Sequence, residues 1–204
     1  MRFYATASGP KVREAMTLGL LGQIVTPAAG NVVHPTTDWC ADNAVFADRY
    51  PGDDEYLAWL GDRSPHADRC VFAVAPDVVC DAVATLDRSA PMLSRIRRAG
   101  YPAALAMQNG IEQLRVPWRD FDVAFLGGDT DWKIGPHARR LTADARAHGK
   151  RVHMGRVNSR RRLRMAAQMG CHSADGTYLA FGPNTNLPRL LGWLGELDRQ
   201  EVLW

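Results

Sequence analysis

The sequence predicts an α/β fold, a small (β/α) barrel of the TIM type, from a pattern that repeats along the chain. Short apolar runs without polar alternation are followed by stretches of helical character, which is typical of parallel strands buried on both faces. About six or seven such units favour a barrel, shortened or incomplete, over an open sheet. A doubly wound open sheet is the alternative, since strand count alone does not decide between the two.

The strands are predicted from the apolar runs and from the turn residues beside them. A first strand is expected over residues 2–7, before the turn Ser8-Gly9-Pro10. Residues 24–37 are expected to form a loop, because Pro, Gly, Thr and Asn are frequent there. Further strands are expected over residues 70–75, 103–107, 121–126 and 151–154, with a last short strand that ends at Asp175.

Helices are predicted between these strands, over residues 11–21, 53–60, 81–99, 136–148 and 160–169. Acidic residues open the helix at 53–60, as the helix dipole favours. Gly100, Gly149 and Gly170 follow three of the helices, and glycine is a common helix stop.

Composition indicates one globular domain over residues 1–204, with 46% hydrophobic and 23% charged residues. No signal peptide and no apolar run of membrane-spanning length is found, so we expect a cytoplasmic protein without a membrane partner. The net charge of +3 favours an anionic partner only weakly. The four cysteines lack metal-site spacing, so we expect no zinc and no other cofactor.

Polar residues or glycines stand at the ends of several strand-like runs. They are Asp42-Asn43, Asp77, Gln108, Gly127-Gly128, Met154-Gly155 and Asp175. Because active sites lie at the carboxyl ends of parallel strands in either fold, we expect these residues to share one pocket. Each also has a plainer explanation, such as a helix cap at Asp77 or a turn at Asp175-Gly176. Their joint occurrence at successive strand ends favours function.

The residue types at these strand ends suit chemistry at a glycosidic bond. Two carboxylates can act as nucleophile and as acid/base. Asp77 and Gln108 can together bind the edge of a purine-like base, since they offer both acceptors and donors. Gly127 and Gly128 leave backbone N–H groups accessible to a carbonyl oxygen of that base.

The order of these motifs resembles the active-site order of tRNA-guanine transglycosylases. Three longer signatures resemble their small phage and bacterial relatives, the DNA-guanine transglycosylases of the 7-deazaguanine DNA modification pathway (the deoxypurine-in-DNA protein A family). The signatures are Leu126-Gly-Gly-Asp-Thr-Asp-Trp-Lys133, His153-Met-Gly-Arg-Val-Asn-Ser159 and Asp175-Gly-Thr-Tyr-Leu-Ala-Phe-Gly182. The resemblance extends from about residue 38 to residue 194.

This resemblance implies a barrel that exchanges guanine in a polynucleotide for a 7-deazaguanine, such as 7-cyano-7-deazaguanine. It implies that Asp175 is the nucleophile at C1′ and that Asp42 is the acid/base for the leaving and entering base. It further implies a base-binding set. That set comprises Asn43, Asp77, Gln108, Gly127, Gly128, Met154 and Gly155, with Met154 packed on the base.

The sequence departs from the tRNA enzymes in two places. Asn43-Ala44-Val45 stands where those enzymes have a serine and two glycines, so the base is handled differently. The zinc-binding cysteine cluster expected after the nucleophile is absent, and with it the subdomain that supports tRNA binding. Both departures favour a different polynucleotide, and we expect DNA.

Basic residues gather between positions 156 and 164. Arg156 and Arg160 are predicted to bind phosphate at the pocket mouth, whereas Arg161 and Arg162 are expected to point elsewhere. Trp132 and Lys133 are a second predicted nucleic-acid contact, through base stacking and charge. A solvated helix face and a core tryptophan are the plainer explanations.

Three functions therefore stay open at this point. The first is transglycosylation of DNA, in the cytoplasm of a bacterium or of a phage-infected host. The second is an N-glycosidase or a nucleoside deoxyribosyltransferase, with water or a free base as acceptor. The third is a non-catalytic nucleic-acid-binding barrel. A homo-oligomer is compatible with each.

Overall fold

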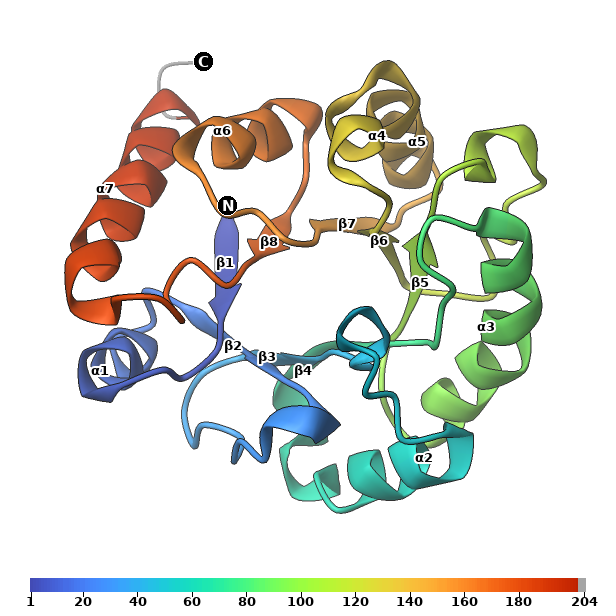
Figure 1. The fold of residues 1–204 in the computed structure, drawn as a ribbon, viewed down its shortest axis with the longest axis horizontal. Coiled ribbons are helices and arrows are strands. Elements are labelled where there is room, and N and C mark those ends of the chain that lie inside the picture. Colours follow the sequence, from blue (N-terminus) through green and yellow to red (C-terminus); the bar gives the residue numbers. More distant parts are fainter. Residues whose placement is uncertain (202–204) are drawn as a thin grey trace.

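The protein is a closed barrel of eight parallel strands in sequential order, surrounded by helices (Figure 1). The fold is described from a computed structural model, which covers residues 1–201, with side chains as far as residue 199. Each strand pairs with the next, and β8 closes the barrel by pairing with β1. The strands are β1 (Arg2–Ala5), β2 (Gly22–Val25), β3 (Trp39–Ala41), β4 (Cys70–Val74), β5 (Ala103–Met107), β6 (Val123–Leu126), β7 (Arg151–Met154) and β8 (Ser173–Asp175).

The chain is shortened in its outer ring of helices, while the sheet is closed. The helices are α1 (Pro10–Thr17), α2 (Asp53–Gly61), α3 (Ala82–Arg98), α4 (Thr130–Ile134), α5 (Pro136–Ala147), α6 (Arg160–Met169) and α7 (Pro183–Glu201). The connections from β2 to β3 and from β5 to β6 hold only the short 3₁₀ turns η1 (Pro27–Ala29) and η4 (Ile111–Gln113). A typical barrel of this kind needs about 250 residues, so the two missing helices account for part of the difference.

The predicted fold class is confirmed, but β2 was assigned to a loop. Its residues Ile24 and Val25 fall within the predicted loop over 24–37. The strand is short and carries a buried glutamine, Gln23, which accepts from the His34 N–H at 2.6 Å and donates to the Val32 carbonyl at 3.0 Å. A polar residue inside a four-residue strand hides the apolar pattern. The helices α4 and α7 were not predicted either.

Alternation along the strands divides the core into two layers. One layer lies inside the barrel and includes Tyr4, Ile24, Phe72, Val74 and Phe125. The other fills the space between the sheet and the helices, and it contains most of the buried side chains. Full burial of a large apolar side chain contributes about 1.5–3 kcal/mol, so both layers stabilise the closed sheet.

A polar network closes the end of the barrel where the strands begin. Asp38 accepts hydrogen bonds from Tyr4 Oη at 2.6 Å and from Arg2 Nε at 3.2 Å, and Arg2 Nη2 forms an ion pair with the same carboxylate. Arg2 also donates to the carbonyl of Leu21 at 2.9 Å. Burial by itself raises the pKa of Asp38, but the bonds from Arg2 and Tyr4 outweigh it and hold this pKa below its ordinary value.

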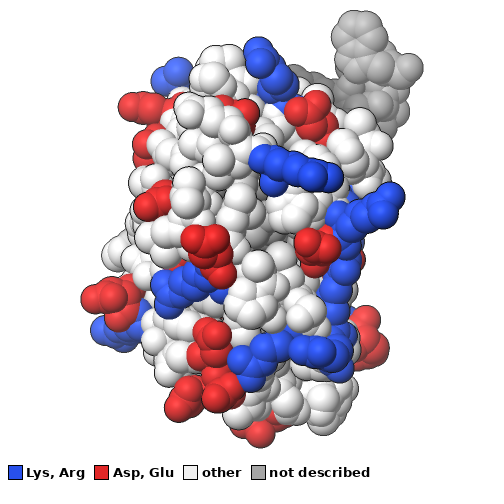
Figure 2. Space-filling view, turned by 90° about the vertical axis from the view of Figure 1, so that its right-hand side faces the viewer, with Lys and Arg blue, Asp and Glu red and all other residues white. Residues whose placement is uncertain are grey.

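The outer surface over α2 and α3 mixes charges of both signs. Figure 2 shows basic and acidic side chains interspersed on the side that carries these helices. Two ion pairs lie there, Arg95 with Asp54 and Arg97 with Asp122. A face of mixed charge offers no extended positive path for a polyanion.

Candidate functional site

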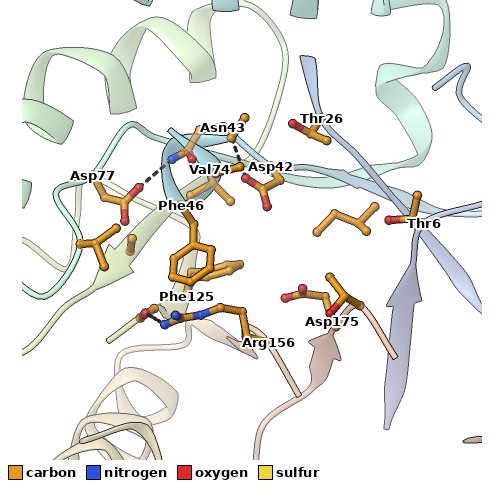
Figure 3. A pocket seen from close by; sticks show the side chains of 18 of the residues that line it. Thr6, Thr26, Asp42, Asn43, Phe46, Val74, Asp77, Phe125, Arg156 and Asp175 are labelled. Atoms are coloured by element: carbon orange, nitrogen blue, oxygen red, sulfur yellow. Dashed lines mark hydrogen bonds between the residues drawn. The ribbon is translucent and has the colours of Figure 1, made fainter. Parts of the chain in front are cut away.

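A cavity of about 460 Å³ lies at the carboxyl ends of the strands. This volume is in the range of small-molecule sites, about 300–1,000 Å³. Seven of the predicted residues line the cavity, namely Asp42, Asn43, Asp77, Gln108, Gly127, Arg156 and Asp175. In Figure 3, Asp42 and Asp175 lie on one side with Thr6 and Thr26, and Asp77 lies on the other side beyond Phe46 and Phe125. The strand-end prediction therefore located the cavity.

Asp175 is held by a histidine that lies inside the barrel. Its Oδ1 is 2.9 Å from Nε2 of His153, and Nδ1 of His153 is 2.8 Å from the Ser173 hydroxyl. His153 is fully buried among aromatic rings, stacked on Phe125 at 4.9 Å between ring centroids. An ionised carboxylate only accepts, so Nε2 of His153 donates to an ionised Asp175. The pair orients Asp175, which lines the cavity, and leaves Oδ2 without a hydrogen-bond partner among the described residues.

Asp42 lies in a different environment from Asp175. Its Oδ1 accepts a hydrogen bond from the Ala44 N–H at 2.7 Å, and Ala44 has a left-handed backbone with φ of 65°. Burial raises the pKa of Asp42 to about 6, against the bond from Ala44, and the charges of Asp175 and Asp77 add to the rise. The side chain still reaches the cavity. A carboxyl group with this pKa can both give and take a proton near neutral pH.

Asp77 is held by two amide side chains. Asn43 Nδ2 donates to Asp77 Oδ1 at 2.9 Å, and Gln108 Nε2 donates to Asp77 Oδ2 at 2.6 Å. Burial raises the pKa of Asp77, and these two bonds oppose the rise. The Gln108 carbonyl oxygen accepts from the Cys80 N–H at 2.9 Å. Both ends of the Gln108 amide are therefore engaged, and Gln108 orients Asp77. Of the expected Asp–Gln pair, the Asp77 carboxylate is the group that is left to bind a base.

The two glycines after β6 do not act as the expected N–H donors. Both Gly127 and Gly128 donate their N–H groups to the Met107 carbonyl, at 3.0 Å and 3.1 Å. Glycine is needed at these two positions because neighbouring side chains leave no room for a Cβ. A Cβ on Gly127 would stand 2.8 Å from Gln108 Nε2, and one on Gly128 would stand 2.5 Å from the Trp132 ring.

Arg156 is built into the cavity wall. Its Nη2 donates to the carbonyls of Gly127 and Gly128, the latter at 2.6 Å, and its guanidinium lies 4.1 Å from the centre of the Phe46 ring. Its backbone is left-handed, with φ of 59°, which costs a non-glycine residue about 1–2 kcal/mol. Such local strain is commonly stored at functional sites. Arg156 and Phe46 thus form one surface of the cavity.

Met154 does not line the cavity. It packs in the layer between the sheet and the helices, because alternation along β7 turns its neighbour His153 inward instead. Gly155 lies beneath the Phe125 ring, and a Cβ there would stand 2.8 Å from that ring. The predicted packing of Met154 on a base is therefore wrong, and Phe46 and Phe125 are the aromatic side chains that line the cavity.

Trp132 and Lys133 are structural residues of α4. Trp132 Nε1 donates to Glu112 Oε2 at 3.0 Å, and buried Lys133 donates through Nζ to the Gly155 carbonyl at 2.6 Å. Burial lowers the pKa of Lys133 to about 7, and the positive charge of Arg156 lowers it further. Buried Lys133 is therefore not available for the nucleic-acid contact that the sequence predicted, whereas the ring of Trp132 is half-buried and its predicted stacking stays a prediction.

Arg162 lies at the cavity and Arg160 does not, which is the reverse of the prediction. Arg160 lies away from the cavity and is paired with Glu196 at 2.7 Å, so it is not at the pocket mouth. Arg162, which was expected to point elsewhere, lines the cavity. The turn of α6 after its cap at Ser159 sets which side chain faces inward.

His153, Phe46, Phe125 and Arg162 were thus missed by the sequence reasoning. The period of two along β7 was the available signal for His153, since a strand that directs Met154 outward directs His153 inward. The same alternation along β6 was available for Phe125. Phe46 lies in the 3₁₀ turn Val45–Ala47 and Arg162 in the first turn of α6, where the sequence contains no comparable signal.

The class of the protein follows from fold and site: it is a closed, eight-stranded TIM-like (β/α) barrel with three carboxylates in a cavity at the carboxyl ends of its strands. No protein family and no curated protein matches the chain. Among the described side chains, no group of three or more His, Cys, Asp or Glu residues is placed to hold a metal ion. None of the helices in the described part of the chain has both the length and the apolar character needed to cross a membrane.

Proposed function

We propose that the protein is a transglycosylase that exchanges guanine in DNA for a 7-deazaguanine base such as 7-cyano-7-deazaguanine. One observation carries this proposal. Two carboxyl groups, Asp42 and Asp175, line a single cavity but lie in contrasting environments. Carboxyl pairs with divided roles perform acid/base and nucleophilic work at glycosidic bonds. The order of the strand-end motifs supports the particular substrate.

Asp175 acts as the nucleophile. Oδ2 attacks C1′ of the deoxyribose, the C1′–N9 bond breaks, and its electron pair leaves with guanine. His153 keeps its hydrogen bond to Oδ1, which becomes the carbonyl oxygen of the ester. The same bond stabilises the carboxylate again when the second base displaces it. His153 therefore orients Asp175 for the first step and assists its departure in the second, without touching the sugar.

Asp42 moves the proton in both steps. With a pKa of about 6 it holds a proton in a fraction of molecules at neutral pH and gives it to the departing guanine. Asp42 then takes the proton from N9–H of the entering deazaguanine, whose nitrogen attacks C1′ and releases Asp175. Two displacements at C1′ give net retention.

The side of the cavity that holds Asp77 binds the base. The carboxylate accepts from the ring N–H and the exocyclic amine of a guanine-like base, while Asn43 and Gln108 keep it in place. Phe46 and Phe125 offer aromatic faces for its rings. The arginine Arg156 lies beneath Phe46 with part of its guanidinium free of the Gly127 and Gly128 carbonyls, and can donate to the base carbonyl.

The test is base exchange in defined DNA. Single-stranded and duplex oligonucleotides are incubated with isotopically labelled guanine or 7-cyano-7-deazaguanine, and the nucleosides are analysed by mass spectrometry. Both strand forms are needed because the target base must leave the stack to reach the cavity. We expect the label in DNA with wild type and none with Asp175→Ala. Release of guanine without incorporation would instead establish an N-glycosidase, and no release at all would contradict the proposal.

A further inference from the structure

The arginines between positions 156 and 164 fall into two groups. Arg156 and Arg162 line the cavity that holds Asp175. The others, Arg160, Arg161 and Arg164, surround a separate hollow on the surface of α6. Only the first group can contact a ligand that also reaches the carboxylates.

Arg162 lines the cavity without a hydrogen-bond or ion-pair partner among the side chains that the structure describes. Arg160 is paired with Glu196, and Arg156 is bound to the Gly127 and Gly128 carbonyls. Arg156 and Arg162 line the same cavity, so two guanidinium groups adjoin one space. A half-buried guanidinium without a partner among the described side chains, in a cavity that a second guanidinium also lines, favours an anion in the adjoining space.

The same wall of the cavity also carries uncharged hydrogen-bonding groups. Thr177 and Asn158 line it, and Asn158 Nδ2 donates to the Thr177 hydroxyl at 3.2 Å. That bond leaves the hydroxyl proton of Thr177 free to donate. α6 begins at Arg160 behind a Ser159 cap, and the positive end of its dipole lies beside Arg162.

We propose that this wall is a phosphate subsite, in which Arg162 binds the phosphodiester next to the sugar whose C1′ faces Asp175. Arg156 adds charge from behind, and Thr177 donates a hydrogen bond. The subsite deepens the proposed function and rests on it for the position of the sugar. It makes the preferred substrate a nucleotide unit of a polynucleotide, in preference to a free nucleoside, because a nucleoside leaves Arg162 unpartnered.

Calorimetric titration tests the subsite without any turnover. The probes are deoxyguanosine, its 5′-monophosphate and its 3′-monophosphate, at one fixed ionic strength. Wild type should bind at least one monophosphate about tenfold more tightly than the nucleoside, the effect of one charge-assisted hydrogen bond. The monophosphate that binds more tightly, 5′ or 3′, identifies which of the two flanking phosphates Arg162 binds.

Arg162→Ala should bind all three compounds alike. Arg164→Ala is the matched control, because it removes the same charge from an exposed position of the same helix and should keep the wild-type preference. Arg162→Gln, which retains much of the aliphatic stem, serves if alanine lowers the melting temperature. Equal binding of the three probes by wild type, a preference retained in the Arg162 variants, or an equal loss in Arg164→Ala would overturn the subsite.

The outcome is separable from that of the proposed function. A wild-type protein that prefers monophosphates but exchanges no base in DNA keeps the subsite and rejects the transglycosylase. An Arg162→Ala protein that exchanges bases with an unchanged KM for DNA keeps the transglycosylase and rejects the subsite.

Discussion

Asp38 and Asp42 flank the same three-residue strand, β3, yet they lie at opposite ends of the barrel. Their pKa values are shifted in opposite directions, downward for Asp38 and upward for Asp42. Burial raises the pKa of both, but Arg2 and Tyr4 hydrogen-bond to Asp38 strongly enough to lower its pKa below the ordinary value. Asp42 receives one bond, from Ala44, and its pKa rises to about 6. Among the described side chains, none of the lysines or arginines lies within ion-pair distance of Asp42.

The two ends of β3 therefore serve different purposes: the Asp38 end stabilises the fold, and the Asp42 end holds the reactive carboxyl groups. At the end where the strands begin, each charge is compensated and the network ties β1 to the residue before β3. At the other end, carboxyl groups share a cavity with incomplete compensation, which is the condition for a group to exchange protons near neutral pH. Each prediction below changes one end and measures both stability and activity.

The largest effect is expected for Asp175→Ala. Loss of the nucleophile should lower base exchange by roughly 10³-fold or more, and no covalent protein–DNA adduct should be trapped on a denaturing gel. The variant should remain folded by circular dichroism, with a melting temperature lowered to the extent that buried His153 loses its acceptor. Exchange at the wild-type rate would show that Asp175 is not the nucleophile.

The double variant His153→Phe/Ser173→Ala should lower exchange by roughly 10- to 150-fold, the value of a hydrogen bond to a charged group. The phenyl ring keeps the packing on Phe125, and removing both polar partners leaves no buried group unsatisfied. A structural role would move the melting temperature and the rate together. His153→Gln supplies an amide donor, and recovery of part of the rate in that variant would indicate positioning of Asp175.

The pH dependence tests Asp42. A carboxyl group with a raised pKa is protonated below that value and loses its proton as pH rises through it, here at about pH 6. Single-turnover release of guanine should therefore fall about tenfold per pH unit well above 6. Asp42→Asn should lower the rate and remove this dependence. A flat profile in the wild type would show that Asp42 is not the acid.

Stability should respond in opposite directions at the two ends. Asp38→Asn should destabilise the protein by about 1–3 kcal/mol in urea unfolding and leave exchange intact. That stability exists above the ordinary pKa of 3.8 and disappears as pH falls below it. Asp42→Asn should stabilise the protein above pH 6 by up to about 3 kcal/mol, because the cost of ionising this buried group develops as pH rises from 3.8 to about 6 and is fully present above that. If both variants destabilised the protein, the predicted opposite contributions of Asp38 and Asp42 to stability would be wrong.

The smallest effect is expected from a chelator. The sequence predicts no zinc site, so prolonged treatment with a chelator should change neither the melting temperature nor the rate of base exchange. Elemental analysis of the untreated protein provides the control, and stoichiometric zinc would contradict the prediction.

The sequence by itself determined the fold class and the position of the site along the chain. Apolar runs such as Cys70–Val74 and Ala103–Met107 are long enough to be strands and lack polar alternation, so they predict a parallel sheet whose polar ends converge. Asp42, Asp77 and Asp175 were therefore found correctly as residues of one cavity. These properties depend on local pattern and on the common direction of the strands.

Only the tertiary structure decided what each side chain does there. Whether His153 or Met154 faces inward depends on how β7 is turned in the barrel, and the engagement of Gln108 with Asp77 depends on a neighbouring strand. Lys133 looks like a surface cation in the sequence, but α4 packs it against the Gly155 carbonyl. Hydrogen-bond partners and local dielectric come from segments far apart in the chain, so the residue pattern at one position does not contain them.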